Sequence, residues 1–380
     1  MITITEPINP ITYDLSRHGK PEDILFFDIE TTGLSPDYCT IYLIGCVFYS
    51  DGQWYLKQFF AESPAAEGEI LFHFFTMLSK YSVLIHFNGD TFDIPFINKR
   101  AARLNIPHAA NEFESLDIYR KLKPYKKLLG IPDCRQKTIE KLLGIHREDI
   151  FNGGQLIEVY KDYLVTHDER GKQFLLLHNA DDLRGMPALL PALYYARLFE
   201  GDYTIKNISV EDYSKNNIPD EESATGTISN LEYGKNAGQL TFTIEFEDID
   251  LPALLSIADN DDYTITAKDN IMNVTINVIN GELKHFFSDY KNYFYLPDED
   301  IAIHKSVAEF VDKEHKKRAT AKNCYTKKSG CFIPAFGMIN QPLFYHEYPL
   351  KHGYVLFDEN MLSDMDFLFD YCDSMIKSIK

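Results

Sequence analysis

The sequence predicts an α/β domain, built as a mixed sheet with flanking helices, followed by an α+β domain with antiparallel strands. Four β-rich runs, 24–30, 41–50, 53–61 and 82–88, enclose a helical pattern at 67–80 and precede a mostly helical stretch. After Glu200 the pattern changes, because residues 225–247 and 262–287 alternate polar and apolar side chains as strands do. At 380 residues, the chain is also too long for one ordinary domain.

These patterns divide the chain into four segments. Residues 1–22 are expected to be an irregular lead-in, 23–200 the first domain, 201–223 a polar linker and 224–380 the second domain. Asp51-Gly52 between two β-rich runs predicts a hairpin. Further helices are predicted in the first domain at 94–105, 136–143, 154–166 and 172–199, and in the second at 298–319 and 361–379.

Composition limits the classes of protein to which the chain can belong. With 45% hydrophobic and 25% charged residues it should fold, and it has no apolar run long enough to span a membrane. The first twenty residues lack an apolar signal core, so we expect a cytoplasmic protein. The six cysteines form no CxxC pair or zinc-like spacing and are read as reduced thiols.

Charge is distributed unevenly along the chain. The net charge of −19 divides into −6 for residues 1–200 and −13 for residues 201–380, which excludes a histone-like coat of positive charge. The window 120–141 opposes this trend with eight Lys or Arg residues against two acids. It is either a surface that follows a phosphate backbone or an ordinary solvated helix surface.

The most informative residues are three groups of acids. Asp28 and Glu30 end a buried strand two positions apart, so they project from the same face of the sheet. Asp93 follows the strand at 82–88 and a glycine turn, and Asp182 lies four residues after His178 in a helical run. Two adjacent carboxylates at a sheet are costly unless a cation neutralises them, and oxygen ligands favour Mg²⁺ or Mn²⁺.

Each group has an ordinary structural interpretation as well. Asp28 and Glu30 suit a strand end that faces water beside a turn, and Asp93 suits a helix cap. His178 and Asp182 suit a solvated helix surface. The order of the three groups along the chain is what favours a common site.

FDIETTGL at 27–34, NGDTFD at 88–93 and HNADD at 178–182 together resemble the DEDD superfamily of metal-dependent 3′–5′ exonucleases, over about residues 20–200. The middle motif resembles that of family B DNA polymerase proofreading domains. The opening motif, KTIEKLLGI at 137–145 and the late HN-x-x-D resemble YprB-like bacterial proteins with a ribonuclease-H-like domain. The resemblance implies a ribonuclease-H-like fold and two metal ions held by four acids: Asp28, Glu30, Asp93 and Asp182.

The resemblance also implies the chemistry, a hydrolysis of phosphodiester bonds in DNA or RNA, with single strands as the expected substrate. Two Mg²⁺ or Mn²⁺ ions would activate water and stabilise the leaving oxyanion. His178 is the expected general base, although it departs from the family: it stands four residues before the last Asp, where one branch has Tyr, whereas the other branch has His five before. Asp181 is an alternative ligand, but the helix turns it about 100° from Asp182.

Contacts with nucleic acid are assigned to six residues: Thr31, Leu34, Asn88, Phe92, Lys126 and Lys127. For Leu34 and Phe92, stacking on the terminal base competes with simple core packing. The rival function is a non-catalytic nucleic-acid-binding protein on the same scaffold, and the complete set of four acids favours the enzyme. The C-terminal half carries no motif that identifies a function, and protein partners are not indicated.

Overall fold

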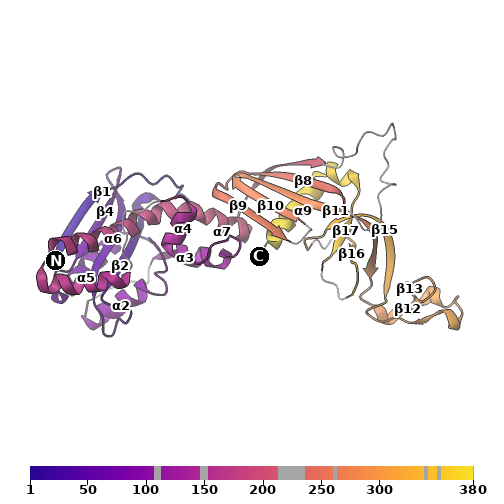
Figure 1. The fold of residues 1–380 in the computed structure, drawn as a ribbon, viewed down its shortest axis with the longest axis horizontal. Helices are drawn as coiled ribbons and strands as arrows, with labels where there is room; N and C mark the ends of the chain where they lie inside the picture. Colours follow the sequence, from indigo (N-terminus) through magenta and orange to yellow (C-terminus); the bar gives the residue numbers. More distant parts are fainter. Residues whose placement is uncertain are drawn as a thin grey trace. The chain divides into compact units, whose positions relative to one another are not determined.

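A computed structural model describes residues 1–106, 113–145, 153–212, 236–259, 263–337, 341–348 and 352–379. The chain divides into two compact units, Met1–Ala196 and Arg197–Lys380 (Figure 1). The expected linker, 201–223, is partly structured: Ile205–Asp212 is a strand of the second unit, and residues 213–223 lie outside the described residues. None of the described helices has the length and apolar content needed to cross a membrane.

The first unit is built on a six-stranded mixed sheet with the order β1-β4-β3-β2-β5-β6. Its strands are β1 (Ile2–Pro7), β2 (Ile24–Thr31), β3 (Ile41–Ser50), β4 (Gln53–Phe60), β5 (Val83–His86) and β6 (Glu114–Asp117). The β1–β4, β4–β3 and β3–β2 pairs are antiparallel, whereas β2–β5 and β5–β6 are parallel. The expected lead-in therefore contains a strand, because the alternation in Ile2-Thr3-Ile4-Thr5 extends the sheet edge.

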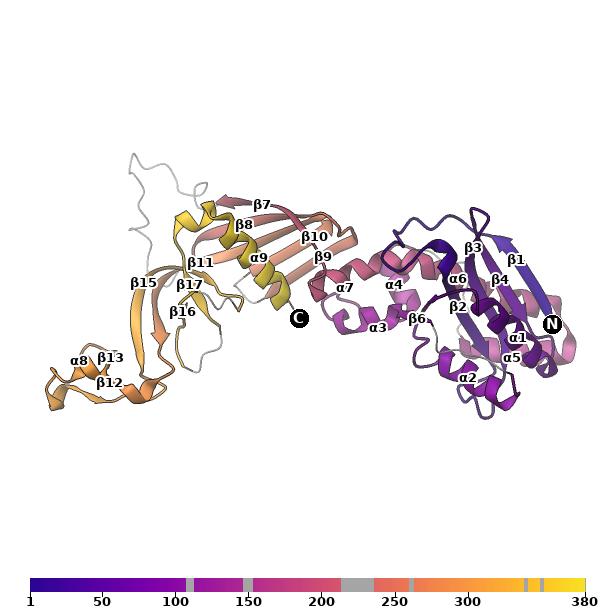
Figure 2. The same ribbon diagram turned by 180° about the vertical axis from the view of Figure 1, so that it is seen from behind.

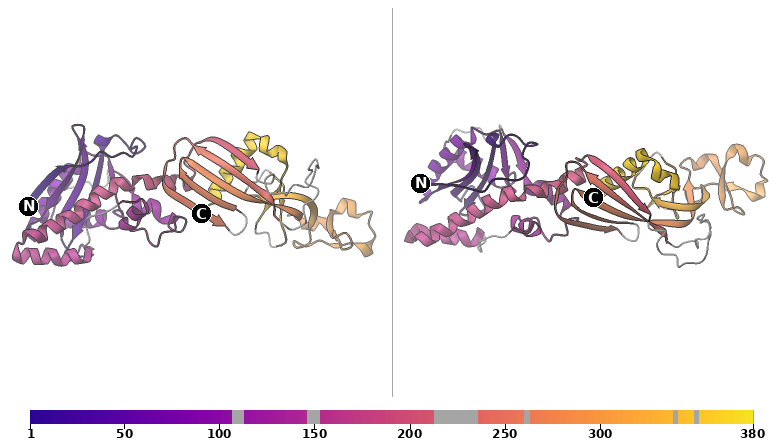
Figure 3. Two further views of the ribbon diagram at one scale, coloured as in Figure 1. Left: turned by 45° about the horizontal axis from the view of Figure 1, so that its top comes forward. Right: turned by 90° about the horizontal axis from the view of Figure 1, so that it is seen from above.

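Helices cover both faces of this sheet. They are α1 (Glu67–Leu78), α2 (Asp93–Arg103), α3 (Ile118–Leu122), α4 (Gln136–Leu142), α5 (Gly153–Thr166), α6 (Glu169–Leu189) and α7 (Leu193–Glu200), which crosses the unit boundary. α5 and α6 run side by side along one face (Figures 1 and 3), and α1 lies on the other (Figure 2). The predicted helix at 172–199 is interrupted, because a short 3₁₀ turn containing Pro191 separates α6 from α7.

Strand β2 is central and has two different faces. Leu25, Phe27 and Ile29 belong to the apolar core shared with α1 and α2. Asp28 and Glu30, at the alternate positions, project toward α6, which packs against β2, β3 and β4. The two-residue period of the strand thus separates the hydrophobic core from the acids.

The second unit contains an eight-stranded antiparallel sheet and a small three-stranded sheet. The large sheet comprises β7 (Ile205–Asp212), β8 (Asn236–Phe246), β9 (Leu251–Asp259), β10 (Tyr263–Asp269), β11 (Ile271–Phe286), β15 (Tyr325–Pro334), β16 (Leu343–Phe344) and β17 (Tyr354–Leu356). Helix α9 (Met365–Ser378) covers one face, where Tyr371 packs on Phe242 with ring centroids 5.7 Å apart. The predicted α+β architecture is confirmed.

The predicted helix at 298–319 is wrong. This segment contains β13 (Ile301–His304), the short helix α8 (Lys305–Ala308) and β14 (Lys317–Arg318), and both strands pair with β12 (Tyr293–Leu296). Asp300 has φ of 52°, and residues 297–300, where the predicted helix would start, form the turn between β12 and β13. Cross-strand pairing has overridden the local helical pattern.

Candidate metal centre

Asp28 is held from the side of helix α6. Asn179, fully buried, donates from Nδ2 to Asp28 Oδ2 at 2.9 Å. Gln58 on β4 donates to Asn179 Oδ1 at 2.9 Å, which fixes the orientation of the Asn179 amide. The carboxylate of Asp28 thus has a firm hydrogen-bonded support behind it.

A glycine makes this approach of α6 possible. Gly45 on β3 pairs with Asp28 on one side and Gln58 on the other, so the three residues form a row across the sheet. A Cβ at Gly45 would come within 2.1 Å of Asn179 Oδ1 and 2.3 Å of Leu183 Cδ1. Only a residue without a side chain lets the helix approach this closely.

His178 and Asp182 project from adjacent turns of α6 toward Glu30. His178 Nε2 lies 3.6 Å from Glu30 Oε1 and 3.5 Å from Asp182 Oδ2. One ligand atom from each of these three residues lies within 4.8 Å of the others, close enough to hold a metal ion together. His178 is 6% exposed, so it is not the surface histidine of the ordinary interpretation.

Asp93 reaches the same place from the start of α2. Its side chain is 6% exposed, and its Oδ1 accepts a hydrogen bond from the backbone N–H of Ile29 at 3.4 Å. Asp93 therefore lies against the stretch of β2 that carries Asp28 and Glu30. Three elements far apart in the sequence, β2, α2 and α6, bring the four predicted acids together.

The carboxyl groups lie so close together that ionisation of each one is less favourable than in water. Burial raises the pKa of Asp28 well above its ordinary range, and the neighbouring Asp182, Asp93 and Glu30 raise it further. Burial also raises the pKa of Asp93 to about 7, although backbone N–H donors oppose the shift. Such a cluster favours a bound divalent cation, and its four carboxylates supply the oxygen ligands that suit Mg²⁺ or Mn²⁺.

The acids open into a cavity of about 390 Å³. Its lining comprises Asp28, Ile29, Glu30, Phe87, Asn88, Phe92, Asp93, Tyr119, Cys134, Arg135, Gln136, His178 and Asp182. Among these residues Arg135 is the sole Lys or Arg, and its side chain is 85% exposed. Gln136 donates to the backbone carbonyl of Asp182 at 2.8 Å, so α4 braces the turn of α6 that bears this acid.

Several of these residues were not predicted from the sequence. Arg135 and Gln136 lie within the basic window 120–141, but its charge pattern does not distinguish either of them from the other residues of the window. Asn179 lies within the HN-x-x-D motif, the only sequence signal that could have identified its role. Gln58 carries no such signal, because its role depends on which residues the neighbouring strands place beside it.

The residues assigned to nucleic-acid contact occupy different places. Asn88 and Phe92 line the cavity. Thr31 is buried, and its hydroxyl donates to the carbonyl of Gly33 at 2.8 Å. Leu34 is 84% exposed on the surface. Lys126 and Lys127 are exposed but do not line the cavity. Asp181, the alternative metal ligand, forms an ion pair with Arg184 at 3.3 Å.

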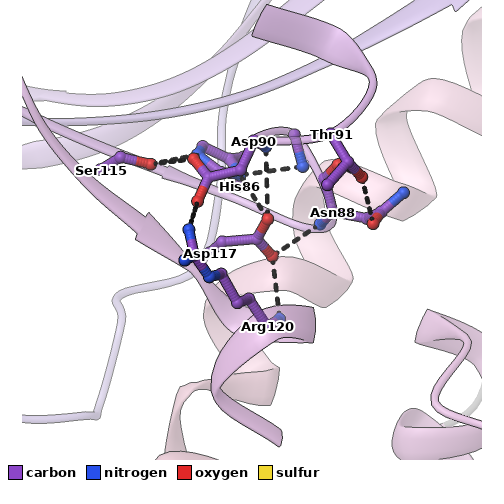
Figure 4. A network of polar contacts seen from close by, with 8 residues as sticks. His86, Asn88, Asp90, Thr91, Ser115, Asp117 and Arg120 are labelled. Atoms are coloured by element: carbon purple, nitrogen blue, oxygen red, sulfur yellow. Dashed lines mark hydrogen bonds and ion pairs between the residues drawn. The ribbon is translucent and has the colours of Figure 1, made fainter. Parts of the chain in front are cut away.

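A second polar cluster lies beside the cavity and fixes the loop between β5 and α2 (Figure 4). Asp117, 4% exposed, accepts hydrogen bonds from three backbone N–H groups, those of Asn88 at 2.9 Å, Asp90 at 3.2 Å and Arg120 at 3.1 Å. Asn88 has φ of 65°, a left-handed conformation that this anchoring maintains. Asp117 therefore holds the loop that leads to Asp93.

His86 completes this cluster as a neutral residue. Its Nδ1 accepts from the backbone N–H of Gly89 at 3.0 Å, which places the ring proton on Nε2, 2.8 Å from Ser115 Oγ. Burial lowers the pKa of His86, although Asp117 and Asp90 act in the opposite direction. His86, Asp90 and Asp117 could together hold a cation by distance, but internal donors already occupy them. We read the cluster as structural.

The first unit combines a mixed sheet, flanking helices and a cavity lined by four acids. Residues 25–194 match the family model described as RNase H superfamily, and this part of the chain is an RNase H-like domain. No curated protein matches the chain.

Solved structures of polymerases and exonucleases resemble parts of the chain. The family B DNA polymerase of the archaeon Pyrobaculum calidifontis is 18% identical with a TM-score of 0.39, over 47% of this chain and 26% of the polymerase. Product-bound exonuclease I is 15% identical with a TM-score of 0.28, over 41% of this chain and 46% of that protein. The zinc-bound E. coli exonuclease I complex with single-stranded DNA gives the same identity and TM-score, over 41% and 43%. The chain thus spans about a quarter of the polymerase and less than half of exonuclease I.

Proposed function

We propose that this protein is a metal-dependent nuclease that hydrolyses DNA or RNA as a 3′–5′ exonuclease on single strands. The observation that carries the proposal is the convergence of Asp28, Glu30, Asp93 and Asp182 in one cavity of an RNase H-like domain. The direction of digestion and the preference for single strands rest on the resemblance of the three motifs to DEDD exonucleases.

The four acids would hold two Mg²⁺ or Mn²⁺ ions, which supply an activated water and stabilise the leaving oxygen. Asn179 keeps Asp28 in place through its 2.9 Å hydrogen bond. His178 lies between Glu30 and Asp182, buried yet at the cavity wall, and from there its imidazole would take the proton of the attacking water.

The substrate would enter past the basic window 120–141. Arg135 lines the cavity with a cationic side chain, whose Nε lies 3.8 Å from Asp133 Oδ2. We expect Arg135→Gln to raise KM with little change in kcat, and to reduce the salt slope of binding by about 0.7 for the lost phosphate contact. Lys137→Gln is the matched control, because Lys137 is exposed two residues further on and does not line the cavity. Equal effects of the two substitutions would contradict this role.

Charge reversal of Lys126 and Lys127 tests whether the substrate strand continues beyond the cavity. Both side chains are exposed, so their substitution should leave the fold intact. A flatter salt dependence of binding would place the strand over them. An unchanged dependence would show that they are ordinary surface residues.

The direct test is digestion of oligonucleotides labelled at the 5′ end, as single-stranded DNA, single-stranded RNA and duplexes. With Mn²⁺ the wild type should give a ladder that shortens from the 3′ end, and EDTA or a blocked 3′ end should stop it. Asp182→Asn should abolish the ladder. Asp181→Asn, its neighbour on α6 that pairs with Arg184, should keep it.

The rival function, nucleic-acid binding without hydrolysis, gives a different result. A protein that only binds nucleic acid should slow the migration of the oligonucleotide but leave it intact in the presence of Mn²⁺. The Asp182→Asn and Asp181→Asn proteins should then behave alike. Internal cleavage of a circular strand would instead indicate an endonuclease.

A further inference from the structure

Tyr42 is a buried phenol on the face of the sheet that carries the acids. It lies on β3, is 1% exposed, and stacks on Tyr160 with ring centroids 4.1 Å apart and an angle of 14° between the rings. Within the described part of the chain, its hydroxyl has no hydrogen-bond partner. A buried hydroxyl without a partner is costly and needs an explanation.

A bulge in the strand accounts for the position of Tyr42. Glu30 pairs with Leu43, but the next residue, Thr31, pairs with Ile41, so Tyr42 is an extra residue opposite the end of β2. Tyr42 and Leu43 consequently pack in the same apolar cluster as Tyr160, although consecutive strand residues normally face opposite sides. The bulge turns the phenol onto the face of Glu30.

Glu30 is the acid to which the Tyr42 hydroxyl can donate a hydrogen bond. Leu43, the residue after Tyr42, pairs with Glu30, and Tyr42 shares its cluster, so the phenol, a hydrogen-bond donor, lies on the face from which Glu30 projects. Asp28 already has such a support in Asn179, which donates to it at 2.9 Å. On the cavity side, Glu30 Oε1 lies 3.6 Å from His178 Nε2.

We propose that Tyr42 is a positioning residue of the metal centre, whose hydroxyl donates to Glu30 and orients this carboxylate toward the bound cation. The inference rests on the proposed function, because it requires Glu30 to be a metal ligand. Outer supports of this kind keep a ligand in one orientation and thereby increase metal affinity.

The test compares two substitutions that each remove one hydroxyl from the same stack. Tyr42→Phe should weaken Mn²⁺ binding by about 10–100-fold, measured by calorimetry and by the EPR signal of bound Mn²⁺. Tyr160→Phe should leave Mn²⁺ affinity unchanged, because the Tyr160 hydroxyl donates to the carbonyl of Ala61 at 2.9 Å and not to an acid. Thermal unfolding in EDTA then reports any purely structural effect of either change.

Two results would overturn the inference. If Tyr42→Phe binds Mn²⁺ like the wild type, the hydroxyl does not position Glu30. If both variants lose affinity equally, the pair acts through packing alone. Failure of the wild type itself to bind Mn²⁺ would instead overturn the proposed metal centre, and the inference with it.

Discussion

Asp93 combines deep burial with proximity to other acids, and the fold raises its pKa from the ordinary value of 3.8 to about 7. Between these two values the folded protein binds a proton that the unfolded chain has released. Stability without metal should therefore decrease as the pH rises through this range, by up to about 1.4 kcal/mol per pH unit for each such group. Asp28, whose pKa is also raised, adds to the same trend.

Urea unfolding in EDTA at about pH 5 and about pH 8 measures this decrease. Asp93→Asn should reduce the pH dependence and should stabilise the metal-free protein at the higher pH, because a neutral amide relieves the repulsion. If the free energy of unfolding changes equally with pH in the wild type and in Asp93→Asn, the buried carboxylate does not titrate as the geometry implies.

His178 is the residue that departs from both branches of the resembled superfamily. It lies within 3.6 Å of Glu30 and Asp182. If its imidazole is the general base, His178→Ala should lower kcat by about 10²–10⁴. His178→Tyr should recover part of this loss, since the spacing to Asp182 is that of the tyrosine branch. Near-normal turnover of His178→Ala in single-turnover assays would remove the histidine from the mechanism.

At the scale of elements, the approach of α6 to the sheet is the feature on which the site depends. A methyl group at Gly45 would overlap Asn179 and Leu183, so Gly45→Ala should push the helix outward. We expect a loss of roughly 1–3 kcal/mol in the free energy of unfolding, as for other overpacked positions, together with weakened Mn²⁺ binding. Gly68→Ala on α1, where nothing lies within 4 Å, is the control and should cost nothing. Equal behaviour of the two variants would contradict this account.

Local pattern was sufficient for some elements and insufficient for others. Alternation along β2 predicted that Asp28 and Glu30 share a face, because that property depends on one strand alone. The row formed by Gly45, Gln58 and Asn179 could not be predicted, because it requires the register of three strands and the depth of a helix. The helix predicted at 298–319 is wrong for the same reason. Its helical spacing is a local property of the sequence, whereas the pairing of its strands with β12 depends on another segment.

At the scale of the whole molecule, each of the two units has its own core. All the candidate metal ligands belong to Met1–Ala196, so Mn²⁺ should stabilise that unit alone. Differential scanning calorimetry should show two transitions, only one of which moves upward when Mn²⁺ replaces EDTA. In Asp182→Asn neither should move. A single transition that shifts as a whole would show that the units unfold together.

The central claim is that the four acids form a metal centre, and anomalous diffraction from crystals soaked in Mn²⁺ tests it most directly. We predict two anomalous peaks about 3.5–4 Å apart in the cavity, bounded by Asp28, Glu30, Asp93 and Asp182. The cluster of His86, Asp90 and Asp117 should show none, because hydrogen bonds from Ser115 and from backbone N–H groups already occupy it. Manganese at that cluster, with no peak among the four acids, would contradict the account.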